Sequence, residues 1–530
     1  MAGTANCSGR IRHFHDFPSV HPYFSYSFLS YIFHFYPFEK SVSMANPLVL
    51  AGLGFYLVLM LGIGLYASRR IKGSADFIVA GKRLSLLLCT ATLAATWFGG
   101  GICIGAASAA YKGGLLAVVA DPFGAALCLF LAGLFYVRLM RRMGLMTIAS
   151  FFTSRFGPKA GLLASLCTIP AYVGWVGSLL VAFGRILQTL TGIEPATGIC
   201  IATAIVLVYT WAGGMWAVTL TDVVQVVVLI LGLFILTPIL ISDMGGWAAI
   251  VAQIPSSRFD FYPQEGTSAS WLSYARNWLV IGLGNLAGQD LIQRSLSSRD
   301  EKIAYRSAYL AGLLYITVGL LPIFLGMAGA VVLPGLADPD LIMMSLAMKY
   351  LPDLALVLFM GALLSALLSS ADSALLAPAS VLGWDLLHYF KPDASEQLSL
   401  RTTRLSVLLL GIFSLAIALQ TSSVYELMVN SWSVLLASLF VPLTAGLWWR
   451  HSNDLGALAS ILVGLCSWQI LSFAAPDMPS DLLAVPFAAI ALVLVSYLSK
   501  DQSPPRPLLD AEGHQLDYTD RLGTQLFAKS

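Results

Sequence analysis

Apolar runs long enough to cross a membrane recur along most of this chain, with short polar stretches between them. A bilayer core needs about 20 apolar residues in helical form, and its backbone amides must be paired within the protein. The ten-residue alternation that marks a transmembrane β-barrel is absent from the sequence. We therefore predict an all-α integral membrane protein, with the lipid bilayer as its partner.

The composition agrees with this prediction and excludes several other classes. Hydrophobic residues make up 58% of the chain and charged residues 11%, whereas soluble domains carry about 25% charged residues. A net charge of +2 gives no reason to expect a nucleic-acid partner. The seven cysteines are scattered without a CxxC pair, which argues against a disulfide framework or a zinc site.

The runs predict about thirteen transmembrane helices, whose boundaries carry an uncertainty of about 2–4 residues. The predicted spans are 48–67, 85–107, 115–139, 160–189, 196–212, 217–241, 272–291, 306–333, 353–377, 404–421, 425–447, 455–473 and 481–498.

Lysine and arginine lie mostly on one side of these spans, at positions such as Arg69, Lys82, Arg141 and Arg294. The other side carries only Lys112, Arg258, Arg276 and Lys349. Because positive loops stay in the cytoplasm, we expect a multi-pass cell-membrane protein with its N-terminus outside and its C-terminus cytoplasmic.

Three segments are expected. Residues 1–43 contain an aromatic-rich run too short for a typical span, and Met44 directly precedes the first span, so we interpret 1–43 as a dispensable or misannotated extension. Residues 44–499 are expected to form the membrane domain. Residues 500–530 form a cytoplasmic tail, and the prolines that follow Asp501 predict a solvated segment.

The second span contains Gly99, Gly100 and Gly101 in succession. Each costs about 1 kcal/mol in a helix interior relative to alanine. Backbone groups freed by a break are tolerated at membrane depth only where protein or a water-filled cavity pairs them. We therefore predict a broken helix whose glycines line a substrate site.

The seventh span repeats this feature. Gly282, Gly284 and Gly288 precede the polar pair Gln289 and Asp290. Broken helices at corresponding positions of two halves are typical of inverted-repeat transporters, so we predict a 5+5 inverted-repeat core with two broken helices. The alternative is that the glycines only allow close helix packing.

Polar residues gather at a few other places. Ser365, Ser369, Ser370, Asp372 and Ser373 lie within nine residues of the ninth span, and four of them share one helix face. Asp222 is expected near the start of the sixth span, where helix capping is the alternative to a role in binding. Asp121 precedes Pro122, and we expect it to be a helix N-cap, with counter-charge for a substrate as the alternative.

These stretches bear a family resemblance. "GGMWAVTLTDVVQ", "SALLSSADSALL" and "ATWFGGG" together resemble the solute:sodium symporter family over residues 47–500, and most closely its choline transporter-like branch in a bacterial-type member. The resemblance implies a thirteen-span, inverted-repeat fold and alternating access driven by sodium.

Carried over residue by residue, the resemblance implies a sodium site. Its ligands would be backbone oxygens near Ala94 and Trp97, the Ala366 carbonyl and the hydroxyls of Ser369 and Ser370. Asp222 matches an acidic position linked to a second sodium, or to its exit, in some relatives. Trp97 and Trp175 match the aromatic residues that hold choline in that branch, but Ala125 and Gly288 stand where choline carriers are aromatic.

The predicted function is a sodium-coupled symporter importing a small organic solute, such as a quaternary amine or an amino acid. The candidate substrate residues are Trp97, Gly99, Gly100, Gly101, Trp175, Gln289 and Asp290. A symporter-like membrane sensor, or a carrier of a sugar or monocarboxylate, is the alternative. The chain lacks a GxxxxGK[ST] loop and has no histidine in a predicted span, so neither an ATP-driven pump nor an enzyme is expected.

Overall fold

The computed structural model describes residues 47–420 and 431–516. Within these residues the secondary structure is helical, apart from two isolated β-bridges, Leu84 with Ser298 and Leu509 with Gln515. Nine of the described helices are long and apolar enough to cross a membrane, and a tenth candidate is a pair of helices bent by 43°. The all-α membrane fold is confirmed, while the count of thirteen spans and the inverted repeat remain predictions.

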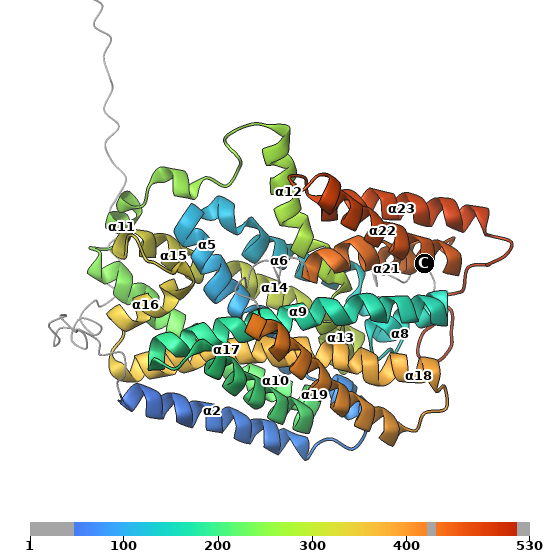
Figure 1. Ribbon diagram of the computed structural model, residues 1–530, viewed down its shortest axis with the longest axis horizontal. Coiled ribbons are helices and arrows are strands. Elements are labelled where there is room, and N and C mark those ends of the chain that lie inside the picture. The colour runs from blue at the N-terminus through green and yellow to red at the C-terminus, as the bar shows by residue number, and fades with distance from the viewer. Residues whose placement is uncertain (1–46, 421–430, 517–530) are drawn as a thin grey trace, which may run out of the picture. The chain divides into compact units, whose positions relative to one another are not determined.

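The first half of the described chain runs from α2 to α11 (Figure 1). Its main elements are α2 (Pro47–Ser68), α3 (Ser74–Val79), α4 (Leu86–Trp97), α5 (Ala107–Gly113), η4 (Val119–Gly124), α6 (Ala125–Phe135), α7 (Val137–Arg142), α8 (Ile148–Phe156), α9 (Pro158–Thr191), α10 (Pro195–Asp243) and α11 (Trp247–Gln253), with a π-helical turn, η2 (Gly101–Ala106), leading into α5.

The second half continues from α12 to α23 (Figure 1). Its main elements are α12 (Ser268–Gly282), η6 (Gly284–Ala287), α13 (Gln289–Ser297), α14 (Glu301–Val318), α15 (Leu320–Val332), α16 (Ile342–Tyr350), α17 (Asp353–Ser380), α18 (Leu387–Phe390), α19 (Glu396–Gln420), η9 (Leu436–Phe440), α21 (Val441–Trp448), α22 (Asp454–Ala474) and α23 (Ser480–Leu498). Part of the span predicted at 425–447 lies outside the described residues.

The long α10 contains both spans predicted at 196–212 and 217–241. Gly214 separates them, with φ 48° and ψ −140°, a left-handed conformation that side chains other than glycine rarely adopt. A Cβ at this position would also lie 2.5 Å from the carbonyl oxygen of Phe77. The chain therefore turns at Gly214, as the boundary between the two predicted spans requires.

Helix α17 packs against α2, α9, α10 and α19, and α4 packs against α10, α14 and α17. The chain just before α4 is also tied to the chain just after α13. Leu84 donates its amide to Ser297 O at 3.0 Å and accepts from the Arg299 amide at 3.0 Å. The two broken helices are therefore joined at one end by backbone pairing.

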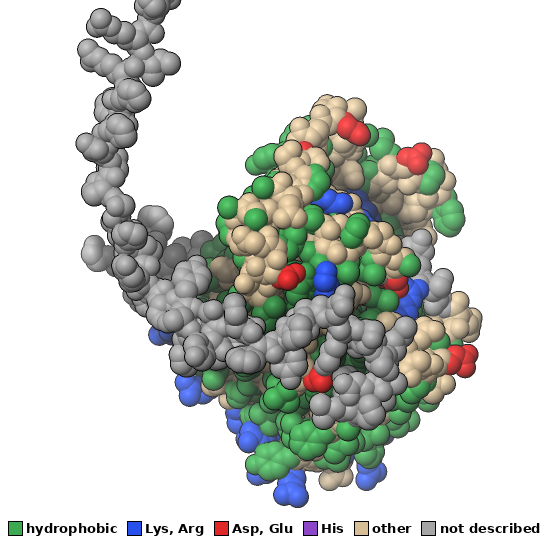
Figure 2. Space-filling model, turned by 90° about the vertical axis from the view of Figure 1, so that its left-hand side faces the viewer, with side chains coloured by type: hydrophobic (Ala, Val, Ile, Leu, Met, Phe, Trp, Pro, Cys, Tyr) green, Lys and Arg blue, Asp and Glu red, His purple; other side chains and the backbone are tan. Residues whose placement is uncertain are grey.

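The outer surface is apolar, as expected for a protein surrounded by lipid. Figure 2 shows hydrophobic side chains exposed among polar ones on one face, and the apolar windows of α22 and α23 are only 22% and 28% buried. Such a surface would aggregate in water, and the hydrocarbon core of a bilayer covers it instead. The protein is a multi-pass membrane protein.

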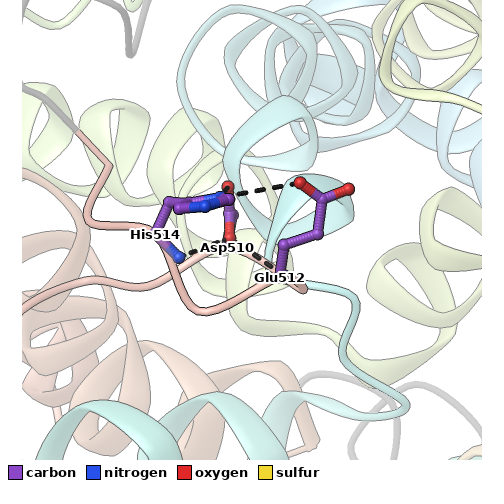
Figure 3. A group of neighbouring side chains, drawn as sticks. All are labelled: Asp510, Glu512 and His514. Carbon is purple, nitrogen blue, oxygen red and sulfur yellow. Dashed lines mark hydrogen bonds and ion pairs between the residues drawn. The ribbon is translucent and has the colours of Figure 1, made fainter.

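Most of the described residues after α23 are exposed, as a solvated tail predicts. Leu508 and Leu516 differ, at 4% and 3% exposed, and the Ala511 amide donates to Arg142 O at 2.9 Å. Asp510 fixes the turn between them, because its carboxylate accepts from the amides of Glu512 and His514 (Figure 3). Residues 1–43 lie outside the described residues.

Candidate functional site

The first predicted break lies where the glycines stand. Helix α4 ends at Trp97, and the helix resumes at Gly101 after a bend of 43°. Gly99 is required here because a Cβ would overlap the Ser370 hydroxyl and lie 2.8 Å from the Ala366 carbonyl. Glycine at this point therefore lets α17 approach the break closely.

The other two glycines meet different neighbours. A Cβ on Gly100 would lie 2.5 Å from Leu367 Cδ2 on α17 and 3.1 Å from Leu179 Cδ2 on α9, and one on Gly101 would lie 3.0 Å from Asp121 Oδ2. The Asp121 backbone is extended at φ −142° and ψ 111°, as at an N-cap, but its Oδ1 is buried without a hydrogen-bond partner among the described residues. Helix α6 begins beyond it, after Gly124, without a side-chain cap. The Asp121 side chain faces the break instead.

Hydroxyl groups from two other helices bind the last carbonyls of α4. Ser370 on α17 donates to Thr96 O at 2.9 Å, and Tyr315 on α14 donates to Trp97 O at 2.7 Å. The Ala94 carbonyl accepts from the Phe98 amide at 2.7 Å. The break is thus lined by oxygen atoms from α4 and α17, which are the ligand type that small hard cations prefer.

The second break is also present. Helix α12 ends at Gly282, the 3-10 turn η6 follows, and Gly288 is extended before α13 starts at Gln289. Gln289 is buried, and its Oε1 accepts from the Ile148 amide at 2.7 Å, which anchors the start of α8. This contact gives Gln289 a structural role that its assignment to the substrate site did not anticipate.

Asp290 joins the two broken helices. Its side chain is fully buried. One carboxylate oxygen accepts from Trp97 Nε1 at 3.1 Å, and the other accepts from the Tyr172 hydroxyl on α9. Trp97 and Asp290, both predicted to bind substrate, are therefore in direct contact.

Aromatic rings extend from this carboxylate. Tyr172 packs against Trp175 with ring centroids 5.7 Å apart, and Trp175 packs against Trp432 at 4.9 Å. Tyr172 and Trp432 were not predicted. Both are aromatic residues inside apolar runs, and the sequence does not distinguish such residues from ordinary packing residues.

Asp222 is at the centre of a second polar cluster. Its carboxylate accepts from Thr92 Oγ1 on α4 and from the Ser369 hydroxyl on α17, and the Arg294 guanidinium on α13 lies 3.7 Å away. Arg294 also donates to the Asp290 carbonyl at 3.0 Å and to the Ser373 hydroxyl.

Arg294 was counted among the positive residues of the loops and helix ends, and the structure places it in the interior. Its side chain is 1% exposed and contacts residues of α4, α10 and α17. Asp222 is equally buried, so a purely capping role does not describe it. The structure therefore groups Asp222, Ser369, Thr92 and Arg294 beside the first break.

Comparison with known proteins places the chain in a family. The model of the Sodium:solute symporter family matches residues 77–464. The human high affinity choline transporter 1 is 31% identical over 447 residues, which cover 79% of this chain and 75% of the transporter. The Escherichia coli sodium/pantothenate symporter is 27% identical over 445 residues, covering 80% of this chain and 90% of that protein.

Solved structures share the fold. A Na⁺-coupled sialic acid symporter superposes with a TM-score of 0.74 at 20% identity, covering 89% of this chain and all of the other. A nucleobase-cation-symport-1 family transporter superposes with a TM-score of 0.60 at 16% identity, covering 86% and 99%. The chain belongs to the sodium:solute symporter family and is a sodium-coupled symporter of a small organic solute.

Proposed function

We propose that this protein imports a small organic solute that carries a cationic amine, such as a quaternary amine or an amino acid, together with sodium. The observation that carries the proposal is the buried Asp290 carboxylate beside the indole of Trp97 and the aromatic row of Tyr172, Trp175 and Trp432. A carboxylate with both oxygens already hydrogen-bonded keeps further lone pairs for a cation.

Charge and ring faces both favour a cation in this place. A cationic amine over a tryptophan face gains about 0.5–2 kcal/mol, depending on how far it is desolvated. An anionic solute would be repelled by the Asp290 carboxylate, and this repulsion is stronger in a region of low dielectric than in water. Among the relatives, the choline transporters fit this reading and the pantothenate symporters favour the alternative of a carboxylate.

Sodium is proposed to bind at the first break. Its ligands would be the carbonyls of Ala94, Trp97 and Ala366 with the hydroxyls of Ser369 and Ser370. The approach of α17 to the break supports this set, because the Ser370 hydroxyl and the Ala366 carbonyl both lie beside Gly99. Asp222 contributes to this site through Ser369, because its carboxylate accepts a hydrogen bond from the Ser369 hydroxyl.

A ligand screen tests the substrate class. Purified protein is melted with amines, amino acids, sugars and carboxylates, each in sodium chloride and in potassium chloride, since a ligand of the folded state raises the melting temperature. We expect stabilisation by an amine, and more of it in sodium. Stabilisation by a sugar or a simple carboxylate, with none from any amine, would contradict the proposal.

The orientation is also proposed, with the Lys82 loop in the cytoplasm and the chain before α12 outside. Cys200 and Cys466 are exposed and free, so both are first replaced by serine, together with Cys7. Lys72→Cys and Ser268→Cys then place thiols at exposed positions on the two sides. An impermeant thiol reagent should label Ser268→Cys in intact cells and Lys72→Cys only after lysis. The reverse pattern would overturn the orientation.

A further inference from the structure

The Trp97 carbonyl is held by one side chain from outside its own helix. Helix α4 ends at this residue, and the last carbonyls of a helix have no partner within it. The Tyr315 hydroxyl on α14 supplies a partner at 2.7 Å. The orientation of this carbonyl therefore depends on Tyr315.

Tyr315 is itself fixed in place. Its side chain is 1% exposed. Its ring meets the rings of Trp97 and Phe98 edge to face, with centroids 6.3 Å and 5.5 Å apart and interplanar angles of 85°. A tyrosine packed in this way cannot swing its hydroxyl far from the end of α4.

Two helices therefore hold consecutive carbonyls of the break from different sides. Ser370 on α17 binds Thr96 O at 2.9 Å, and Tyr315 on α14 binds Trp97 O. Ser370 already belongs to the proposed sodium site, whereas Tyr315 lies outside the proposed set of ligands and contacts one of them, the Trp97 carbonyl.

We propose that Tyr315 is a positioning residue for the sodium site, which orients the Trp97 carbonyl toward the ion. The inference rests on the proposed function, in which this carbonyl is a sodium ligand. A carbonyl oxygen has two lone pairs, so one can accept from Tyr315 while the other faces sodium. Without the hydroxyl, the carbonyl at the helix end loses its fixed direction. Part of the binding free energy of sodium is then used to order this carbonyl, so sodium binds more weakly.

The test compares Tyr315→Phe with Tyr136→Phe. Tyr136 is also buried, at 4% exposure, and its hydroxyl is paired with Thr444 Oγ1 at 2.7 Å, a contact made by neither α4 nor α17. Both variants lose one buried hydroxyl from a ring of the same size. The melting temperature of each purified protein is followed as sodium replaces potassium at constant ionic strength.

The sodium concentration at half-maximal stabilisation should rise about 3- to 10-fold in Tyr315→Phe, the effect of losing one hydrogen bond, and stay unchanged in Tyr136→Phe. The melting temperature in potassium alone measures the structural cost of each substitution separately. An unchanged or lower sodium midpoint in Tyr315→Phe would overturn the inference. If the unmodified protein itself shows no specific response to sodium, the proposed function fails instead.

Discussion

Arg294 and Asp222 face each other in the interior of the membrane domain, with 3.7 Å between guanidinium and carboxylate and only 1% and 0% of their side chains exposed. Arg294 lies on the second broken helix, and Asp222 also accepts from the first, through Thr92. A single buried ion pair therefore connects both broken helices to α10.

Replacing Arg294 with methionine should destabilise the protein strongly. Removing one partner of a buried pair leaves the other charge uncompensated and costs about 3–5 kcal/mol. The double variant Arg294→Met/Asp222→Asn should recover part of this loss, because neither charge remains. The measurement is thermal unfolding in detergent.

Arg299→Met is the matched control for this prediction. Its ion pair with Asp300 is exposed on both sides, at 72% and 44%, and exposed pairs contribute about 0–1 kcal/mol. Equal losses of melting temperature in Arg294→Met and Arg299→Met would show that the buried ion pair contributes no more to stability than the exposed one.

The tail should contribute to stability through Leu508. Its side chain is 4% exposed, whereas that of the next residue, Leu509, is 38% exposed. Leu508→Ala should cost about 2–5 kcal/mol, as buried leucine-to-alanine changes do, and Leu509→Ala much less. Thermal unfolding of the two variants measures the difference. Similar melting temperatures would show that the Leu508 side chain does not pack against the rest of the protein in solution.

Stability should depend on pH through Lys82. Burial, and next the charge of Arg141, lower the pKa of Lys82 from 10.5 to about 8. The folded state therefore binds this proton less tightly than the unfolded state, so the protonated amine costs stability fully below pH 8. That cost fades as the pH rises from about 8 toward 10.5.

Lys82→Gln removes this cost while keeping a donor for the Gly144 carbonyl that Lys82 binds. The variant should gain melting temperature over the unmodified protein at pH 7, and the gain should shrink at pH 9.5. A difference that stays constant between these pH values would show that Lys82 does not titrate as the structure implies.

The two helix breaks could be predicted from the sequence, but the residues that contact them could not. Three adjacent glycines in a span conflict with a continuous helix, so the interruption at Gly99 is a local property. The contacts of Tyr315, Tyr172 and Trp432 join residues more than 100 positions apart in the chain. Apolar runs contain many such aromatic residues, and only the tertiary structure shows which of them contact the breaks.

Charged residues were misjudged for a related reason. The position of Arg294 near a helix end is typical of a loop cation, and the tertiary fold buries it because Asp222 lies opposite. Gln289 and Asp290 are neighbours in sequence, but the helix directs them to different partners, the Ile148 amide and the Trp97 indole. A pattern identifies polar residues in a membrane segment, and their roles follow from what they face.

Substrate affinity should depend on the ring of Trp175. In Trp175→Phe the aromatic face remains, whereas Trp175→Leu keeps bulk and loses the face. If the substrate is a cation over this ring, the leucine variant should bind about 2- to 30-fold more weakly, the range of a cation–π contact. Uptake of the amine found by the ligand screen measures this, and equal affinities in the two variants would reduce Trp175 to a packing residue.

Uptake into proteoliposomes tests the sodium-coupled mechanism most directly. Vesicles containing the purified protein receive the amine found by the screen, under an inward sodium gradient or an equal potassium gradient, and accumulation is measured over time. We predict accumulation above the outside concentration only with sodium, and a higher sodium requirement in Ser369→Ala/Ser370→Ala. Equal accumulation in sodium and potassium would contradict the account, and unchanged sodium dependence in the double variant would remove these serines from the site.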